Sequence, residues 1–260
     1  MLVYGPKPQE SQPTMPKRRT GESGQSPNRL LAALPPDDFR RIDALLKPLP
    51  LRLKRILYKP GDVVDDVYFP GGGFVSVVNV LANGDMVEVA TIGREGMVGV
   101  SAVNPGYRES SLSMVQMEAQ HCFRMTAAAF RGEMDRRGPF FELITRFAQA
   151  LLGSSMQSTA CNAVHRIEQR LAKWLLFAHD RVGSNQYPLT QEFVAMMLGA
   201  ARPTVTIVAG TLQRAGLITY KRGKIIVVNR QALELASCEC YGVTTALLER
   251  VTTGLSRARA

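Results

Sequence analysis

The sequence predicts an α+β protein built from three parts in order: a small all-β unit, a long helix, and a helix-turn-helix followed by a β-hairpin. Short apolar segments of β type, separated by turn residues, fill the chain from residue 51 to 125. A helical pattern with heptad spacing starts at Gly138, and two short helical segments precede two β-type segments between residues 189 and 228. Because 45% of the residues are hydrophobic and 21% are charged, we expect a soluble globular protein. No run of about 18 apolar residues occurs, so we expect no membrane contact and a cytoplasmic location.

Residues 1–28 are interpreted as a disordered tail, because they contain five prolines and three glycines and almost no apolar periodicity. They also lack the apolar stretch of a secretory signal. A short helix is expected after the tail. Its N-terminal signal is Pro35-Pro36-Asp37-Asp38, and its apolar positions are Phe39, Ile42, Leu45 and Leu46.

Residues 29–137 form the predicted β unit, which is a barrel, a roll or a sandwich. Strands are expected over 51–58, 67–69, 74–81, 86–92, 110–116 and 121–125, followed by a short helix over 126–137. Pro60-Gly61-Asp62 predicts one turn. Asn83-Gly84-Asp85 predicts a hairpin with a type I′ turn, in which both central residues need a positive φ.

Residues 138–164 form the predicted long helix. Its apolar and small residues recur in steps of four and three, so one stripe packs either against the β unit or against a second copy of the chain. We take the second alternative as the candidate dimer interface and include the neighbouring Leu151. The residues are Leu143, Phe147, Ala150, Leu151, Ser154, Gln157 and Cys161.

Residues 165–245 are predicted to form a winged helix-turn-helix unit, and residues 246–260 a C-terminal tail. An amphipathic segment over 165–182 comes first, with Trp174 as a core anchor. Thr190 then caps a helix that ends at Gly199, and a second helix begins at Arg202-Pro203 and stops at Gly216. Strands over 217–220 and 224–228 enclose Lys221-Arg222-Gly223 and form a wing with a cationic tip.

The charge distribution indicates a polyanion as partner of this last unit. The last 72 residues carry 9 Lys and Arg against 4 Asp and Glu, which is half of the net charge of +10. The second helix would place its N-terminal end in the major groove of double-stranded DNA, while the wing holds phosphates. The candidate DNA-binding residues are Thr190, Gln191, Arg202, Pro203, Thr204, Thr206, Ile207, Lys221, Arg222 and Lys224.

Residues 29–240 resemble the Crp/Fnr superfamily of bacterial transcription regulators. The resemblance is carried by residues 189–218, by Pro60-Gly61-Asp62, and by the Asn83-Gly84-Asp85 hairpin with Gly93-Arg94-Glu95-Gly96 after it. It implies a β-roll sensor (a double-stranded jelly roll of cyclic-nucleotide-binding type), a homodimer joined by the long helix, and two recognition helices on DNA half-sites. It also makes RNA polymerase a candidate partner. Arg202 matches a DNA-contacting arginine of the family, whereas Pro203 and Ile207 replace polar or charged base readers, so no operator sequence is implied.

The candidate effector pocket departs from the cyclic-nucleotide pattern of the family. Such members hold the ribose with a Gly-Glu pair and the phosphate with an Arg-Ser pair, and these align with Gly99-Val100 and Ser110-Ser111 here. A buried phosphodiester without an arginine would be poorly compensated. Arg108 lies two positions early, and Ser155 matches a hydroxyl that faces adenine in the family. Cyclic AMP is therefore not expected, and the effector stays unidentified.

No cofactor, metal site or enzymatic activity is predicted. No cysteine precedes Cys122, which excludes an N-terminal iron–sulfur ligand group, and no histidine pattern indicates haem. The spacing of the four cysteines is not that of a zinc site, and Cys238 and Cys240 are interpreted as free thiols. Nucleotide-binding and hydrolase motifs are absent from the sequence. The alternative function is a small-molecule-binding regulatory module that acts on a protein partner.

Overall fold

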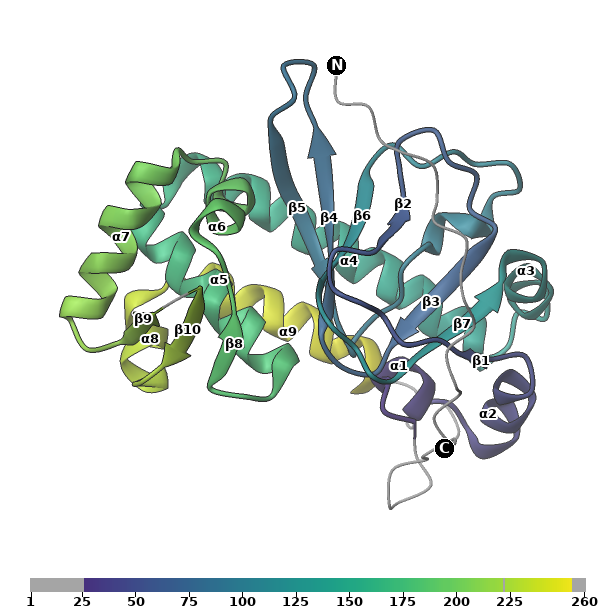
Figure 1. Ribbon diagram of the computed structural model, residues 1–260. Helices are drawn as coiled ribbons and strands as arrows, with labels where there is room; N and C mark the ends of the chain where they lie inside the picture. Colours follow the sequence, from purple (N-terminus) through teal and green to yellow (C-terminus); the bar gives the residue numbers. More distant parts are fainter. Residues whose placement is uncertain (1–25, 222, 254–260) are drawn as a thin grey trace.

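The computed structural model describes residues 26–221 and 223–253 and confirms the α+β class (Figure 1). Two antiparallel sheets form the β-roll. The four-stranded sheet has the order β2-β6-β4-β5, from Ile56–Tyr58, Leu112–Met117, Phe74–Val80 and Met86–Ile92. The three-stranded sheet has the order β1-β7-β3, from Lys47–Pro48, Cys122–Thr126 and Asp66–Pro70. A 3-10 turn, η1 (Val100–Val103), precedes β6.

Two short helices, α1 (Arg29–Ala32) and α2 (Pro36–Asp43), lie at the start of the described chain. The predicted tail is wrong at its end, because Asn28 is fully buried. Its amide nitrogen donates to the carbonyl oxygens of Pro70 (2.7 Å) and Gly96 (2.9 Å), and its side-chain oxygen caps α1 by accepting from Leu31 N. This residue therefore fastens the chain to the β-roll, whereas residues 1–25 lie outside the described ranges.

The β4–β5 hairpin is confirmed, but its turn differs from the prediction. Gly84 has a φ of +88°, whereas Asn83 is not among the residues with positive φ. Gly84 N donates to Leu81 O (2.9 Å), and Leu81 N donates to Asp85 O (2.8 Å). This is a three-residue loop that ends on a left-handed glycine, so only one residue needs the conformation that type I′ requires of two.

Two helices lead from the β-roll into the second half of the chain, as predicted. They are α3 (Ala127–Asp135), capped by Thr126, and the 26-residue α4 (Pro139–Val164). Helix α4 ends where His165 adopts an extended conformation, and the chain continues as α5 (Ile167–Val182). Helix α5 is followed by Gly183 in the left-handed conformation. Proline at the start of α4 fits the first helical turn, where its missing N–H has no partner to lose.

The four-stranded sheet contributes to two hydrophobic cores. Its inner face, with Val75 and Val115, packs toward the three-stranded sheet and α4. Its outer face, with Phe74, Val78 and Leu112, packs against the C-terminal helices. The Phe74 ring meets Trp174 at a centroid distance of 5.9 Å. Because each face of this sheet contributes to one of the two cores, the β-roll and the C-terminal unit share one wall.

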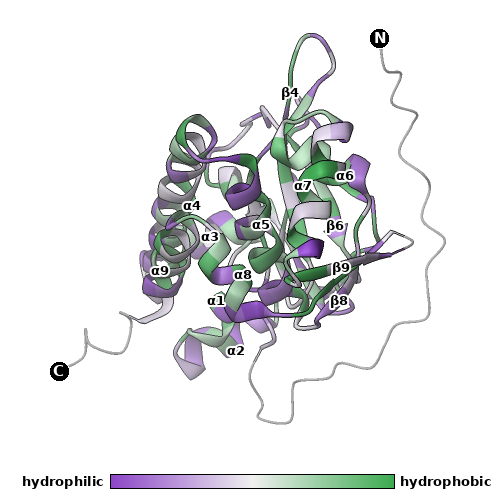
Figure 2. Ribbon diagram, turned by 90° about the vertical axis from the view of Figure 1, so that its left-hand side faces the viewer, coloured by the Kyte–Doolittle hydropathy of each residue, from purple (hydrophilic) through white to green (hydrophobic). Residues whose placement is uncertain are grey.

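Residues 230–253, beyond the wing, contain two helices that were not predicted from the sequence. α8 (Arg230–Ala236) is followed by α9 (Cys240–Thr253), which lies along α4 (Figure 2). The expected C-terminal tail is therefore wrong for residues 246–253, and the predicted boundary at 245 falls inside α9. Thr244 and Val251 are buried under α4, which explains why this segment is ordered as a helix.

Within the described part of the chain, no single helix is both long enough and apolar enough to cross a membrane. Helices α6 (Gln191–Leu198) and α7 (Arg202–Arg214) reach that length only as a pair, bent by 104° between them.

Candidate nucleic-acid interface

The helix-turn-helix is formed by α6 (Gln191–Leu198) and α7 (Arg202–Arg214). The Thr190 side chain caps α6 by accepting a hydrogen bond from Phe193 N (3.2 Å). Gly199 ends α6 with a φ of +57°, a conformation that costs glycine little, and the two helices meet at 104°. Val205, Val208 and Leu212 bury one face of α7. The opposite face of α7 is left to solvent.

The exposed face of α7 starts at its first turn. Arg202, Pro203, Thr204 and Thr206 are all exposed, and Ile207 keeps 67% of its surface in contact with solvent. A large apolar side chain this exposed suits contact with a thymine methyl group. No acidic residue lies in the first turn of α7, whose unpaired N–H groups favour an anion.

One hydrogen-bond chain fixes this turn relative to α6. The Thr206 hydroxyl lies 2.8 Å from Gln191 Oε1 and 3.1 Å from the carbonyl oxygen of its own helix at Arg202. Gln191 therefore contacts α7 through the Thr206 hydroxyl, and both side chains already form a hydrogen bond within the protein. Among the described residues, no hydrogen bond or ion pair holds the Arg202 side chain, which leaves its guanidinium free for a base edge or a phosphate.

The wing has the predicted two strands, β9 (Ile218–Lys221) and β10 (Lys224–Val227), and an additional strand, β8 (Gln186–Pro188). Lys221 and Lys224 face each other directly across the hairpin, and both are exposed. Like charges in this position destabilise a hairpin unless an anion lies between or beside them. The third cation predicted here, Arg222, lies outside the described residues.

The segment between α6 and α8 carries only basic residues among its charged side chains. Between Glu192 and Glu234 the sequence contains no Asp or Glu and six Lys or Arg residues. These cations are Arg202, Arg214, Lys221, Arg222, Lys224 and Arg230. Arg230 is paired with Asp180 and Glu234, so the cations left for a partner lie on α7 and the wing. An excess of positive charge there steers a polyanion toward this surface and raises the rate of encounter.

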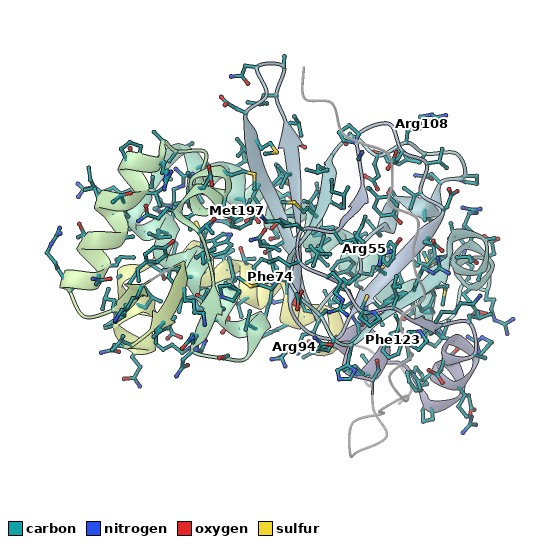
Figure 3. All side chains as sticks on the ribbon, viewed as in Figure 1. Arg55, Phe74, Arg94, Arg108, Phe123 and Met197 are labelled. Carbon is teal, nitrogen blue, oxygen red and sulfur yellow. The ribbon has the colours of Figure 1, made fainter. Side chains whose placement is uncertain are left out.

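Buried polar contacts fasten the helix-turn-helix to the β-roll. Figure 3 shows Phe74 and Met197 at the boundary between the two halves, and the Ser76 hydroxyl donates to Met197 Sδ (3.7 Å). Trp174 Nε1 donates to Glu88 Oε1 (2.8 Å), while Glu88 Oε2 is buried without a hydrogen-bond partner among the described residues. Burial raises the pKa of Glu88 to about 7, because desolvation outweighs the hydrogen bonds and nearby cations that stabilise its ionised form.

A buried ion pair reinforces the same boundary. Arg181 from α5 contacts Glu95 at 2.8 Å, and the two side chains are 6% and 13% exposed. Burial opposes ionisation of Glu95, but attraction to Arg181 and hydrogen bonds to the carboxylate prevail and lower its pKa. Arg181 also leaves no room for a side chain at Gly93, since a β-carbon there would lie 2.7 Å from Arg181 Cδ.

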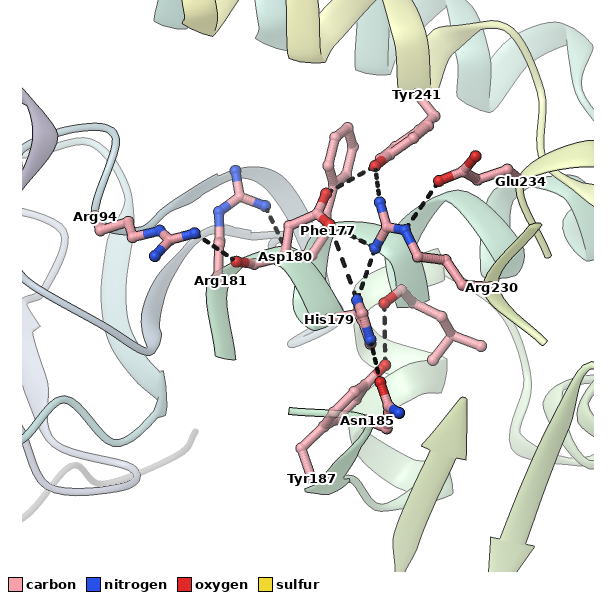
Figure 4. Close-up of polar contacts among 11 residues, drawn as sticks. Arg94, Phe177, His179, Asp180, Arg181, Asn185, Tyr187, Arg230, Glu234 and Tyr241 are labelled. Carbon is pink, nitrogen blue, oxygen red and sulfur yellow. Dashed lines mark hydrogen bonds and ion pairs between the residues drawn. The ribbon is translucent and has the colours of Figure 1, made fainter. Parts of the chain in front are cut away.

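A second polar network joins α5 to the helices after the wing (Figure 4). Arg230 donates to Asp180 Oδ1 (2.6 Å) and to the Tyr241 hydroxyl (2.7 Å), and that hydroxyl donates to Asp180 Oδ2 (2.8 Å). Arg94, which follows β5, reaches the carbonyl oxygen of Asp180 at 3.4 Å. Asp180 of α5 is thus tied to the β-roll through Arg94 and to α8 and α9 through Arg230 and Tyr241.

The predicted effector residues lie at the start of η1, in the loop before β6 and on α4. Arg108 is exposed in a loop at the far side of the β-roll (Figure 3) and donates to the carbonyl oxygen of Gly61 (2.7 Å). Ser110 is exposed, and the Ser155 hydroxyl is bonded to its own helix at Leu151 O (3.0 Å). Gly99 has a φ of +88° and lies close to the Tyr58 hydroxyl. A cavity of about 240 Å³ lies elsewhere, between α5, α9 and the loop around Arg94.

Part of the predicted dimer stripe on α4 is buried within the chain itself, whereas Leu151, Ser154 and Gln157 are half-buried. Leu143, Phe147 and Ala150 are buried in the core of the β-roll, and Cys161 is fully buried beside α9. A stripe displaced by two residues, or about 200° around the helix, is exposed instead. Its members are Gln149, Leu152, Met156, Thr159 and Ala163. Leu152 and Met156 keep 63% and 65% of their surfaces exposed.

Residues 169–236, from α5 through α8, match the family of Crp-like helix-turn-helix domains. No curated protein matches the chain by sequence.

Solved structures resemble about three quarters of the chain. A CRP-family transcriptional regulator from Thermus thermophilus is 19% identical with a TM-score of 0.60, over 73% of this chain and 96% of that one. The c-di-GMP-responsive global regulator CLP of Xanthomonas campestris is 14% identical with a TM-score of 0.60, over 74% and 99%. FixK2 of Bradyrhizobium japonicum is 15% identical with a TM-score of 0.57, over 74% and 98%. At these identities the likeness establishes the fold.

Proposed function

We propose that this chain, whose residues 169–236 match the family of Crp-like helix-turn-helix domains, is a transcription regulator of Crp/Fnr type. We further propose that two copies of it bind a two-fold symmetric DNA site and do so without a cyclic nucleotide. The observation that carries the proposal is the first two turns of α7, whose exposed face lacks acidic residues and includes an unpaired arginine, Arg202, and a largely exposed isoleucine, Ile207. Contact with RNA polymerase belongs to the same proposal and depends on the family resemblance alone.

The roles of the DNA-facing residues follow from their positions. Arg202, Thr204, Thr206 and Ile207 would face base edges in the major groove, because they occupy the first two turns of the recognition helix. Lys221 and Lys224 would bind phosphates and fix the register of the protein on the duplex. Pro203 leaves the first turn without one N–H, so the backbone offers fewer donors to DNA there than other residues would allow.

We expect Arg202→Ala to weaken binding to the specific site by about 1–3 kcal/mol if the guanidinium pairs with a base. Fluorescence anisotropy with specific and scrambled duplexes measures this loss. Arg40→Ala is the matched control, since Arg40 is an exposed arginine on α2 with only an exposed partner, Asp37. Equal weakening on both duplexes would make Arg202 a phosphate contact instead.

The homodimer is proposed to form through the exposed stripe of α4. Leu152 and Met156 lie one turn apart on the face that no other part of the described chain covers. Heptad spacing of this stripe allows two copies of α4 to pack along each other. A dimer of this kind would present two α7 helices with the symmetry of a palindromic site.

The substitution Met156→Glu is expected to convert the dimer to a monomer, because it would place two carboxylates close together in the apolar seam. Sedimentation equilibrium reports the change directly. The control is Leu235→Glu, which adds the same charge on α8 at a residue that is 89% exposed. A Met156→Glu protein that remains dimeric would exclude this face as the interface.

The absence of cyclic-nucleotide control is proposed from the β-roll itself. No arginine accompanies the Ser110-Ser111 pair, and Arg108 already binds the Gly61 carbonyl oxygen on the exposed side of the loop. A cyclic phosphate would therefore lose its hydration without gaining a charged partner.

The experiment that tests the function is anisotropy of the full chain with its own upstream DNA and with scrambled DNA, across a salt series, with and without cyclic AMP. We expect a salt-sensitive preference for the upstream DNA that cyclic AMP does not change. Salt-independent or absent binding would favour the alternative, a regulatory module that acts on a protein partner. A preference that appears only with cyclic AMP would overturn the effector part of the proposal.

A further inference from the structure

Four metal-ligating side chains meet where α4 ends and α9 begins. They are Cys161, His165, Cys238 and Cys240, and their ligand atoms all lie within 4.8 Å of one another. The Sγ atoms of Cys161 and Cys238 are 3.5 Å apart, and Cys240 Sγ lies 3.6 Å from His165 Nδ1. Ligand atoms around a tetrahedral zinc ion are separated by about 3.5–3.8 Å, since Zn–S and Zn–N bonds are about 2.3 and 2.0 Å long. The cluster therefore has the size of a metal site before any ion is present.

The backbone explains why these four residues converge. Cys161 and His165 are four residues apart at the last turn of α4, so they share one face, and His165 N bonds to Cys161 O (3.0 Å). Cys238 and Cys240 precede and open α9, which packs along α4. The winged helix-turn-helix lies between the two pairs in sequence. Their spacing along the chain therefore gave no zinc pattern, and only the packing of α9 on α4 brings them together.

Polar side chains surround the sulfur atoms, although buried thiols that only fill space require no such neighbours. The three cysteines form a buried cluster of their own, separate from the two hydrophobic cores. The buried Lys173 directs its ammonium at Cys161 Sγ (3.2 Å), and Gln157 donates to Cys240 Sγ (3.0 Å). Among the described residues, no carboxylate forms an ion pair with Lys173. A buried cation facing neutral thiols is poorly compensated, whereas three thiolates on a divalent ion carry one net negative charge that Lys173 would balance.

The histidine is also arranged as metal-binding histidines are. Glu239 Oε1 lies 3.1 Å from His165 Nε2, so the carboxylate favours a proton on that nitrogen. The Nδ1 lone pair is then left toward the cysteines. Glu239 stands between the two cysteine ligands in sequence, which places the supporting carboxylate at the site it orients.

We propose that Cys161, His165, Cys238 and Cys240 bind one tetrahedral zinc-type divalent ion that fastens the start of α9 to the end of α4. Binding converts three thiols to thiolates, and their three protons are released to solvent. The ion stabilises the fold by closing both ends of the DNA-binding unit onto the long helix. Binding of the ion is independent of the DNA sequence that the protein recognises and of any effector.

The test is metal titration of the reduced full chain, with Co²⁺ as the probe and Zn²⁺ as the competitor. We expect one equivalent of Co²⁺ to give the visible absorption of tetrahedral cobalt thiolate, and Zn²⁺ to abolish it. Elemental analysis should find one zinc per chain, and thermal unfolding should occur at a lower temperature after chelation. Cys122→Ser is the matched control, because Cys122 is a buried cysteine in the β-roll outside the cluster.

Two variants keep the test decisive if cysteine substitutions impair folding. His165→Gln alters a partly exposed side chain and should remove the nitrogen ligand, lowering metal affinity and shifting the cobalt spectrum. Glu239→Gln leaves all four ligands in place and should weaken binding about tenfold through the histidine. Failure of the reduced protein to bind Co²⁺ would overturn the proposal. So would a Cys161–Cys238 disulfide in protein isolated without reductant and without metal, which would assign a redox pair instead.

Discussion

Arg181→Met is expected to lower the free energy of unfolding by about 3–5 kcal/mol, the usual cost of leaving a buried charge without its partner. The substitution keeps much of the side-chain volume at the boundary between α5 and the β-roll but leaves the Glu95 carboxylate buried and uncompensated. Urea unfolding at neutral pH measures the loss. The effect should shrink at acidic pH, because Glu95 can then take up a proton.

The double variant Arg181→Met with Glu95→Gln separates charge from packing. It should recover most of the lost stability, since no unpaired charge remains. A double variant as unstable as the single one would show that Arg181 acts through its aliphatic stem against Gly93 and not through the ion pair.

Glu88→Gln should remove a pH-dependent destabilisation of about 3 kcal/mol. The pKa of Glu88 is about 7 in the folded protein, against 4.5 as its ordinary value. The folded state therefore binds the proton more tightly than the unfolded state. The contribution of protonated Glu88 to the free energy of unfolding is fully present below pH 4.5. It is lost as the pH rises through 7 and does not return at higher pH. The variant should gain most over the original protein near pH 8 and little near pH 4.5.

The readout is the difference between the two stability curves against pH, obtained by urea unfolding. The exposed Glu249 supplies the control as Glu249→Gln, which should leave the curve of the original protein unchanged in shape. Parallel curves for Glu88→Gln and the original protein would mean that Glu88 is hydrated and ionised in the folded state.

Features that depend on neighbouring residues in sequence could be predicted. The helix-turn-helix follows from the Thr190 cap, the left-handed Gly199 and the proline at the start of α7. The β4–β5 hairpin follows from Asn83-Gly84, although its turn type does not. The exposed face of α7 follows from the apolar periodicity of Val205, Val208 and Leu212. In each case the determining interaction spans a few residues.

Features that depend on distant contacts could not be predicted. The stripe through Leu143 and Phe147 had two possible partners, and only the packed structure shows that the β-roll occupies it. The position of α9 depends on its packing along α4 and on the burial of Val251 in the core that α4 shares with the β-roll. The cysteine and histidine cluster joins residues separated by an entire domain, and the Glu88–Trp174 contact joins residues 86 positions apart. No local pattern encodes such pairs.

The four-stranded sheet, as the common wall of both cores, makes the chain a single folding unit despite its two-part appearance. Losing the C-terminal helices would bare Phe74, Val78 and Leu112 on one side, and losing the three-stranded sheet would bare Val75 and Val115 on the other. Neither half can melt without exposing apolar surface of the other, so the whole chain should melt cooperatively. A fragment that contains only the DNA-binding unit should therefore be less stable than the same unit in the full chain. A substitution in the four-stranded sheet should destabilise both halves of the protein.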